Sequence, residues 1–425
     1  MSDNLLCKSI CSLVFNVNEK VSKEKDSLKI YIGLENIHSN STKITVTSNA
    51  SDSISTNNVF KKNDILFGKL RPQLRKCVQP NFDGYCSTDI IVLRANIEVD
   101  PYFAFKILQS DRVFSRAIQL EEGTKMPRCS WKTIKDIIIF HPPLYEQRKI
   151  AKILTTVDNL IEKTETLIAK YQSIKQGMMH DLFTRGVDAN GQLRPPVDEA
   201  PELYKESELG WIPREWEVKM IQEIAEVKGG KRMPAGQSFS ETPTPYPYIR
   251  VSDMKNWSVD STDIVYVPKE IEPLICNYKI SKKDLYISIA GVYLGLVGTI
   301  PESLDNAQLT ENAAKIIIKE KNAHSKEYLV AFFNSFYFES QLEQAKGIGA
   351  GVPKLALHRI EKFNVVLSPI KEQIKISSMI YCLKNRILGE KEYLLKLKVL
   401  KKALMQDLLT GKVRVKPDKP KDTPS

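Results

Sequence analysis

Residues 143–187 read PLYEQRKIAKILTTVDNLIEKTETLIAKYQSIKQGMMHDLFTRGV, and residues 369–413 read PIKEQIKISSMIYCLKNRILGEKEYLLKLKVLKKALMQDLLTGKV. A constant shift of 226 positions places the second stretch on the first without a gap. Both stretches begin with P-x-x-E-Q-x-K-I and end with M-x-D-L-x-T, so the chain contains an internal repeat. The repeat predicts a protein of two halves, each ending in the same long element.

Each stretch has the apolar spacing of a long amphipathic helix. With Ile150 and Ile376 at position a, mostly apolar residues recur at a and d, which predicts two helices packed lengthwise as a coiled coil. A flanking apolar row, which includes Leu154 and Ile380, makes the stripe wider than one partner helix requires, so further helices are expected to dock on it. The alternative is an ordinary pair of core helices. The residues expected to serve helix pairing and subunit docking are Ile150, Val157, Leu160, Leu167, Tyr171, Ile376, Leu383, Leu397 and Leu400.

Composition indicates a folded chain with an affinity for polyanions. The protein has 425 residues, 42% of them hydrophobic, which predicts several domains with sizeable cores. A net charge of +11 favours partners such as nucleic acid. The seven cysteines are odd in number and form no CxxC pair, which is typical of reduced thiols in a cytoplasmic protein. The sequence contains no apolar run that predicts a transmembrane helix and no secretory signal.

Two globular segments alternate with the long helices. Residues 1–142 and 208–368 each contain short β-like runs separated by turn residues and helical patterns, at 101–120 and 328–344. Residues 188–207 are polar with proline and glycine, so we expect a linker there, and residues 414–425 form a tail. The globular segments resemble each other only loosely, whereas the helices match well. This contrast predicts a constant scaffold that carries two different recognition domains.

Motifs for catalysis or cofactor binding are absent from the sequence. It has no P-loop motif, no HExxH and no cysteine–histidine cluster at zinc spacing. The stretch 141–144, HPPL, departs from a methyltransferase motif and is better explained as a turn into the first long helix. The sequence therefore predicts a chain with no catalytic residues, no metal and no cofactor of its own.

Basic residues gather instead in loops beside predicted strands and glycines. Arginine and lysine in such loops can reach phosphates or base edges, although any one of them can also be a solvated surface charge. Two of the loops, GTKMPR at 123–128 and GAGVPK at 349–354, again lie 226 positions apart. The candidate DNA-binding residues are Lys69, Arg71, Arg75, Lys76, Lys125, Arg128, Lys228, Lys231, Arg232, Arg250 and Lys354.

Together these features resemble the specificity subunits of Type I restriction-modification systems, over nearly the whole chain. The resemblance rests on the two P-x-x-E-Q helices, on LGWIPREWEV at residues 209–218 and on the matched G-x-x-x-P-[RK] loops. It implies an α+β fold with two mixed target-recognition domains, residues 1–142 and 208–368. Two long antiparallel coiled-coil helices, residues 143–187 and 369–413, would join them in a pseudo-twofold internal repeat.

The resemblance also implies function and partners. The chain would be the non-catalytic subunit that reads a bipartite double-stranded DNA target, with the helices as a spacer of roughly 60 Å. Two methyltransferase subunits would dock on it and carry S-adenosylmethionine, and restriction subunits, two in number, would use ATP and Mg. We keep two alternatives, a coiled-coil protein-binding adaptor without DNA specificity and a nuclease with an unrecognised active site.

Overall fold

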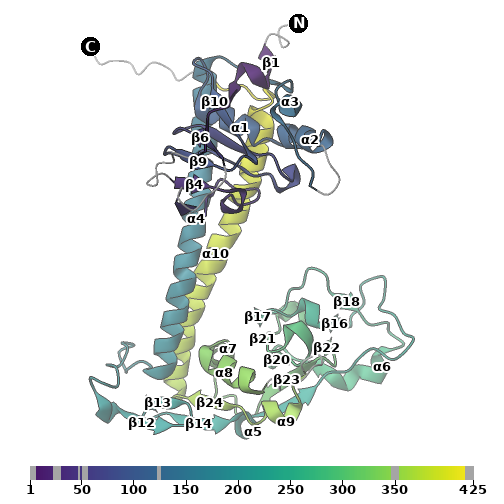
Figure 1. The fold of residues 1–425 in the computed structure, drawn as a ribbon. Coiled ribbons are helices and arrows are strands. Elements are labelled where there is room, and N and C mark those ends of the chain that lie inside the picture. Colours follow the sequence, from purple (N-terminus) through teal and green to yellow (C-terminus); the bar gives the residue numbers. More distant parts are fainter. Residues whose placement is uncertain are drawn as a thin grey trace, which may run out of the picture. The chain divides into compact units, whose positions relative to one another are not determined.

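The computed structural model of the protein describes residues 6–22, 30–45, 48–49, 56–121, 126–345 and 354–416. Two compact units divide the chain: unit 1 combines Met1–Thr166 with Lys391–Ser425, and unit 2 is Leu167–Glu390. The division falls inside two long helices, α4 (Leu144–Thr184) and α10 (Ile370–Leu408), which Figure 1 shows as continuous ribbons. Each unit therefore contains part of both helices, a domain of mixed helices and sheets, and its own hydrophobic core.

The ends of the long helices follow from local sequence. Pro143 and Pro369 come directly before the first helical residues, and proline suits a helix start because its φ is already near the helical value. Gly186 and Gly411 follow the C-terminal ends with φ of 64° and 75°. This left-handed conformation ends many helices and is readily adopted only by glycine. The repeat thus encodes both boundaries of each helix.

The two long helices run antiparallel within each unit. In unit 1, Asp158 and Glu165 of α4 contact Lys401 and Lys398 of α10, so positions rise along one helix as they fall along the other. In unit 2, the Arg386 guanidinium of α10 lies over the Tyr171 ring of α4, and Val187 N, just after α4, donates to Glu372 near the start of α10 at 2.8 Å.

The buried seam of these helices uses a different pair of rows from the predicted one. On α4 the buried residues Ile150, Leu154 and Val157 are four and three positions apart, and on α10 the buried residues Ile376, Ile380 and Ile387 lie on the same two rows, four and seven positions apart. The expected d-position residues Leu160 and Leu400 remain 39% and 46% exposed. The flanking apolar row therefore packs inside, because a stripe three rows wide offers two possible seams.

Unit 1 is built on two sheets. The four-stranded sheet has the order β2 (Val14–Val17), β10 (Ile90–Ala95), β7 (Ile65–Gly68) and β8 (Cys77–Val78). The five-stranded sheet has the order β3 (Lys20–Val21), β6 (Asn57–Phe60), β9 (Gly84–Cys86), β4 (Ile30–Ile32) and β5 (Ser48–Asn49). The remaining elements are α1 (Pro101–Leu108), α2 (Asp111–Gln119), α3 (Trp131–Ile134) and the strand pair β1 (Cys7–Ser9) with β11 (Ile138–Phe140).

Unit 2 has the same kinds of elements. Its five-stranded sheet has the order β15 (Ala225–Gly229), β23 (Ala313–Ile318), β20 (Leu285–Ser288), β21 (Val297–Thr299) and β17 (Trp257–Ser258). Its four-stranded sheet has the order β18 (Val265–Tyr266), β16 (Pro247–Ile249), β22 (Ala307–Leu309) and β19 (Lys279–Ile280). The other elements are α5 (Ile221–Ile224), α6 (Glu272–Ile275), α7 (Lys326–Phe333), α8 (Phe336–Ala345), α9 (Leu357–Ile360), and the pairs β12 (Tyr204–Ser207) with β13 (Gly210–Pro213) and β14 (Glu217–Met220) with β24 (Asn364–Leu367).

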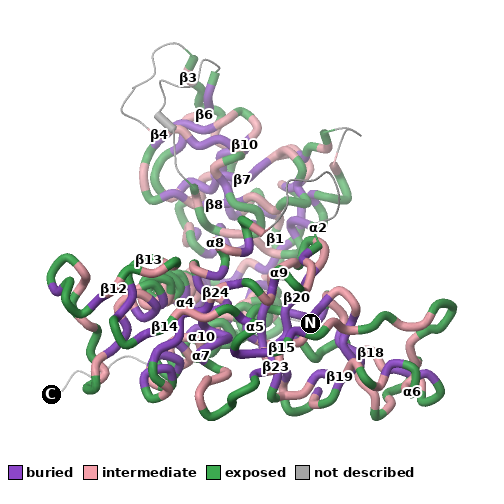
Figure 2. Tube along the Cα trace, turned by 90° about the horizontal axis from the view of Figure 1, so that it is seen from below, coloured by how far each residue is buried: buried purple, intermediate pink, exposed green. Residues whose placement is uncertain are grey.

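The two units share their central strand pairings although their sequences and some edge strands differ. In unit 1, β10 pairs antiparallel with β2 and β7, and in unit 2, β23 pairs antiparallel with β15 and β20. The parallel pair β4–β9 corresponds to the parallel pair β16–β22. Strands β7 and β20 are buried along their whole length, as the purple trace of Figure 2 shows for this part of each sheet. These two buried strands therefore hold the loops that follow them in a fixed position at the edge of each sheet.

Several expected segments have more structure than their composition indicates, and others lie outside the described residues. The predicted linker at 188–207 contains a hydrogen-bonded turn, in which Asp188 N donates to Gln192 O at 2.8 Å, and strand β12. In the predicted tail, Arg414 forms an ion pair with Glu146. Lys125 and most of the two matched loops, residues 123–125 and 349–353, are not described.

Candidate nucleic-acid interface

One edge of the unit 1 sheet brings two of the predicted basic loops together. After β7 ends, Lys69 N donates to Asp89 O at 2.8 Å, and Cys129 N donates to Lys69 O at 2.9 Å. Arg71 N then donates to Pro127 O at 2.8 Å, and an isolated β-bridge joins Leu70 to Arg128. The loop after β7 and the loop before α3, which are far apart in sequence, thus lie side by side.

The cations at this edge influence one another electrostatically. Burial lowers the pKa of the Lys69 ammonium, Asp89 opposes that effect, and the positive charges of Lys20 and Arg128 lower the pKa further. The Lys69 Nζ donates to Thr88 O at 2.6 Å, and Arg128 pairs with Asp89 at 3.3 Å. Lys20 was not among the predicted residues. When the strand registers of the two units are aligned, Lys20 occupies the position of Lys231, which was predicted. This correspondence could have identified Lys20 as a candidate.

The four cations of the segment GKLRPQLRK have different surroundings. Arg75 pairs with Asp111 at 2.5 Å and lies 5.1 Å from the centre of the Phe114 ring, and Lys76 donates to Leu34 O at 2.6 Å. These two side chains hold the loop in place. Arg71 is exposed, and the described residues supply its guanidinium with no hydrogen-bond or ion-pair partner. Of the two arginines, Arg71 is the one available to bind a ligand.

The equivalent edge of the unit 2 sheet carries three of its predicted cations. Lys231 N donates to Leu309 O at 2.8 Å, which places Lys231 and Arg232 beside the chain that leads into β23. On the other side, Leu355 N donates to Ile289 O at 2.8 Å, and a β-bridge joins Ala290 to Lys354. These contacts repeat those of Cys129 with Lys69 and of Arg128 with Leu70. Arg128 and Lys354 therefore occupy the same place in the two units.

The remaining predicted residues of unit 2 have other contacts. Arg232 is exposed and pairs with Glu311 at 3.0 Å, and the Lys231 Nζ lies 5.7 Å from the centre of the Tyr278 ring. Lys228 pairs with Glu226 at 2.6 Å within β15. Arg250 pairs with Asp253 at 2.8 Å and with Asp263 at 3.2 Å, and the hydrogen bonds to Asp253 raise the pKa of its guanidinium. Arg250 thus closes a turn of its own chain.

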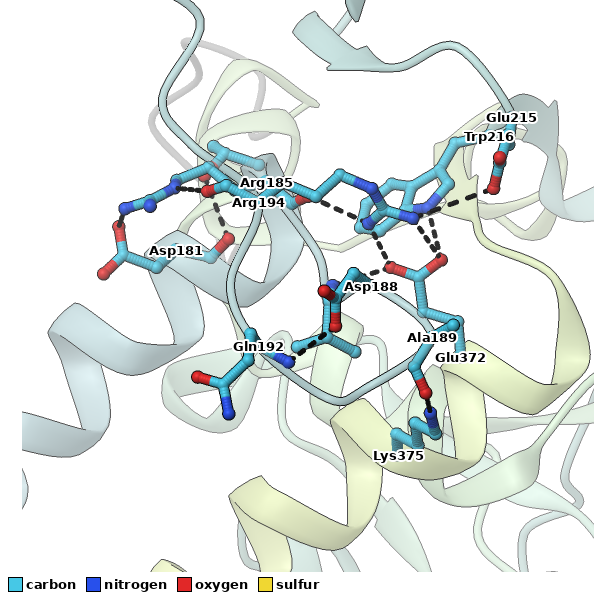
Figure 3. Close-up of polar contacts among 12 residues, drawn as sticks. Asp181, Arg185, Asp188, Ala189, Gln192, Arg194, Glu215, Trp216, Glu372 and Lys375 are labelled. Atoms are coloured by element: carbon cyan, nitrogen blue, oxygen red, sulfur yellow. Dashed lines mark hydrogen bonds and ion pairs between the residues drawn. The ribbon is translucent and has the colours of Figure 1, made fainter. Parts of the chain in front are cut away.

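The repeated start of each long helix has a structural role, which Figure 3 shows for unit 2. The buried carboxylate of Glu372 accepts hydrogen bonds from Arg194 at 2.6 Å, from Trp216 Nε1 at 3.0 Å and from Val187 N at 2.8 Å. Burial lowers the pKa of Arg194, but its bonds to Glu372 outweigh that effect and raise it overall. We call this set of contacts the clasp, since it binds the start of α10 to the chain leaving α4.

Unit 1 contains the matching clasp. The Glu146 carboxylate, which is fully buried, accepts from Arg414 at 2.6 and 2.8 Å and from Val415 N at 3.2 Å. The glutamine that follows also has one role in both units. Gln147 accepts from Asp100 N at 3.0 Å, and Gln373 accepts from Ser325 N at 2.9 Å. Each long helix is thereby joined to the start of a domain helix, α1 or α7.

The domains are attached to the helices by different chemistry. In unit 1, Asp158 of α4 lies between Lys106 at 2.5 Å and Lys401 at 2.6 Å, and one heptad later Glu165 lies between Lys43 at 2.7 Å and Lys398 at 2.9 Å. In unit 2, the Trp257 ring, and not an acidic residue, contacts two lysines of the helices. Lys175 and Lys384, from α4 and α10, lie 4.7 Å and 5.4 Å from its centre.

The predicted pairing and docking residues divide by exposure. Ile150, Val157, Ile376 and Leu397 are buried, and Leu167, Tyr171 and Leu383 are half-buried. Leu160 and Leu400 are exposed. The other exposed large apolar side chains on the described parts of the two helices are Tyr145, Ile174, Ile374, Met379, Leu388, Tyr393, Leu395 and Val399. Within the described ranges, no group of three His, Cys, Asp or Glu side chains is arranged to bind a metal ion.

Comparison with known proteins gives a consistent result. The family described as Type I restriction modification DNA specificity domain matches residues 7–172 and 213–398. The Type I restriction enzyme MjaVIII specificity subunit of Methanocaldococcus jannaschii is 25% identical over 333 residues, which cover 78% of this chain and 74% of that protein. The EcoDI specificity subunit of Escherichia coli is 25% identical over 141 residues, 32% of this chain and 31% of that protein.

Solved structures resemble the fold at low sequence identity. The crystal structure of a Type I restriction-modification S subunit from M. genitalium has a TM-score of 0.60 at 18% identity, and the alignment covers 95% of both chains. A chain from a study of complex assembly in the type I R-M system has a TM-score of 0.53 at 17% identity, with 96% of this chain and 98% of that chain covered.

Proposed function

The chain belongs to the Type I restriction-modification DNA specificity family, and we propose that each of its two units reads one half of a split DNA target. It is the specificity subunit, which recognises DNA for a restriction-modification complex and is not itself catalytic. The purely protein-binding adaptor is not favoured, because the relatives matched over most of the chain are specificity subunits.

The observation that carries this proposal is the repeated sheet edge. Both units place the loop after a buried strand, β7 or β20, next to an equivalent basic residue, Arg128 or Lys354. The backbone contacts are the same, but the side chains on these loops differ. Equal backbone geometry with different side chains is what two readers of different half-sites require, because base edges are distinguished by side-chain chemistry while backbone contacts position the protein.

We propose that the long helices set the distance between the half-sites. The helices have 41 and 39 residues, which at 1.5 Å per residue gives a length of roughly 60 Å. Each carries one clasp at its start, so the helix pair and the domains are connected in the same way twice. A pseudo-twofold arrangement of the domains would follow from this repetition, and a split target mirrors such symmetry.

We further propose that the exposed apolar side chains of α4 and α10 bind partner subunits. Leu160, Leu400 and Tyr393 lie on the helix surfaces outside the buried seam. In the complex, two methyltransferase subunits would bind here and hold S-adenosylmethionine, and two restriction subunits would use ATP and Mg. The described helices include none with the length and apolar character that crossing a bilayer demands. We place the complex in the cytoplasm with the cell's DNA.

Sequencing of methylated bases tests the proposal directly. DNA from cells that carry this chain and its methyltransferase partner is compared with DNA from cells that lack only this chain. We expect a split motif with two specific halves and a non-specific gap, present only when the chain is present. A methylation pattern that does not depend on the chain would refute the proposed function.

A further inference from the structure

The inference rests on the proposed function and concerns the turn that follows each buried strand. The turn of unit 1, residues 71–75, joins β7 to β8, and the turn of unit 2, residues 291–295, joins β20 to β21. Gly68 N donates to Lys76 O at 2.9 Å, and Ser288 N donates to Leu296 O at 3.0 Å, so the two hairpins close in the same register.

The backbone of the two turns is also the same. Arg71 and Arg75 have φ of 50° and 52°, and Gly291 and Gly295, at the equivalent positions, have φ of 75° and 92°. Left-handed backbone is uncommon for arginine and easy for glycine, so unit 1 keeps side chains here against a conformational preference. Sites that retain such strain are often functional.

The unit 2 turn is held rigidly at its base. Leu294 N donates to Gly291 O at 3.1 Å and Gly295 N to Ser288 O at 2.9 Å. The side chain of Ser288, which is fully buried, accepts from Leu296 N at 2.8 Å and donates to Tyr293 O. A Cβ on Gly295 would collide with Leu342 of α8, so the turn also lies tightly against that helix. Its tip is therefore presented in a fixed position.

The tip of the unit 2 turn is apolar where the unit 1 turn is cationic. Val292 is 95% exposed and Tyr293 is 44% exposed. Gly291, which stands where unit 1 has Arg71, offers no cation. Lys354 is bridged to the neighbouring Ala290, so an exposed positive charge lies beside the apolar tip. The position suits DNA, because phosphate contacts can orient the turn toward the base edges.

We propose that Val292 determines specificity in unit 2 by contacting the 5-methyl group of a thymine in the major groove. Valine has no hydrogen-bonding group, and the thymine methyl is the one apolar feature that a base pair presents at a groove edge. Wedges that open base steps in the minor groove are usually larger side chains, such as phenylalanine or leucine. A short, rigidly held valine fits a methyl contact better. Unit 1 has the exposed cation Arg71 at the same place, where it can contact a phosphate.

The test measures DNA binding by the complete methyltransferase complex. Each thymine of the methylated motif is replaced in turn by deoxyuridine, which removes only the methyl group. For the wild-type chain we expect one thymine at which this replacement weakens binding about fourfold, the effect of one buried methyl group. The variant Val292→Ala should bind the unmodified DNA more weakly and lose its sensitivity at that thymine alone.

Two control variants separate this effect from general damage. Leu274→Ala removes an exposed apolar side chain of α6 and should leave every thymine response unchanged, and Leu74→Ala alters the turn of unit 1 and should leave the Val292-dependent thymine unaffected. If the complex keeps its motif but no thymine loses sensitivity in Val292→Ala, or if the motif contains no thymine, the inference is wrong. If the complex has no sequence-specific binding at all, the proposed function fails instead.

Discussion

At the scale of single residues, the glutamates at the start of the long helices explain the most conspicuous part of the repeat. Glu146 and Glu372 are buried carboxylates, and each is paired with an arginine that follows the other long helix. A buried charge is tolerated when its hydrogen-bonding capacity is satisfied, and both carboxylates meet that condition. The P-x-x-E-Q motif is thus architectural, because its glutamate and glutamine join the start of each long helix to other parts of the same unit.

We predict that Glu372→Ala destabilises unit 2. The substitution leaves Arg194 and the Trp216 indole N–H buried without their acceptor, which typically costs about 3–5 kcal/mol. Thermal or urea unfolding of the chain measures the loss. Glu215→Gln is the control, since this exposed side chain also pairs with Arg194, at 3.7 Å, and should change stability by less than ~1 kcal/mol. Equal effects of the two substitutions would contradict the clasp.

We predict that Arg71→Ala weakens DNA binding without affecting folding. The exposed guanidinium has room to bind a phosphate, and losing one such contact should reduce the slope of log affinity against log salt by about 1. The matched variant is Arg75→Ala, which removes the contacts with Asp111 and Phe114 and should lower stability as well. An unchanged salt slope in Arg71→Ala, measured by DNA titration at several salt concentrations, would exclude Arg71 from the interface.

At the scale of elements, the helix surfaces are divided between internal packing and exposed apolar rows. Leu154 is buried and Leu160 is not, although both lie on the apolar stripe of α4. The seam buries two of the three apolar rows within the chain and leaves the third row exposed. Exposed apolar area of this kind commonly marks a protein–protein interface.

We predict different outcomes for charged substitutions in the two rows. Leu160→Glu should leave the fold intact but prevent the methyltransferase subunits from binding, because a charge at an apolar interface is costly to desolvate. Leu154→Glu should instead unfold unit 1, because this side chain is fully buried. Circular dichroism and size-exclusion chromatography with the partner separate the two results. Normal assembly with Leu160→Glu would exclude this row from docking.

Attachment of the unit 1 domain should be sensitive to acid. Hydrogen bonding to Lys43, reinforced by Lys398, holds the pKa of Glu165 below its usual value of 4.5. A carboxylate whose pKa is lower in the folded state stabilises the fold fully above its unfolded pKa and loses that contribution as the pH falls through the folded pKa. Stability should therefore fall below about pH 4.5 more steeply in the wild type than in Glu165→Gln.

The control for this acid effect is Glu162→Gln, which removes an exposed carboxylate on the same helix. Melting curves recorded between pH 3 and pH 7 compare the three proteins. The wild type and Glu162→Gln should lose stability in parallel. If Glu165→Gln also follows the same curve, the two lysine contacts contribute nothing measurable.

At the scale of the whole molecule, the chain consists of two units that have the same construction. Each unit combines a domain with part of both long helices, and the clasps join the start of one helix to the end of the other. In unit 1 the attachment of the domain uses ion pairs, and in unit 2 it uses Trp257 between two lysines. The frame is thus repeated, while the reading loops and some attachments have diverged.

The proposed spacing role predicts the result of lengthening the frame. One additional heptad inserted midway in both α4 and α10 extends each helix by about 10 Å and keeps the seam in register. The non-specific gap of the methylated motif should then grow by about three base pairs, at 3.4 Å per base pair. Sequencing of methylated bases reads the gap directly. An unchanged gap would show that the helices do not set the spacing.

The sequence by itself determined the repeat, the length of the long helices, the pairing of the basic loops at Arg128 and Lys354, and the family. These features are local or periodic: a 3.5-residue spacing and a preceding proline specify a helix wherever it lies. The sequence also indicated that the two globular segments correspond, although they resemble each other only loosely outside the loops at 123–128 and 349–354.

Only the tertiary structure decided which apolar row forms the seam, which cations are free and what the repeated glutamates do. A wide stripe allows two seams, and the choice between them depends on the partner helix. Arg71 and Arg75 are neighbours in sequence, yet Arg75 meets Asp111 and Phe114 only through packing of α2. Glu372 finds Arg194 across 178 positions. Contacts at such separation have no local pattern, because they form when the folded chain closes around them.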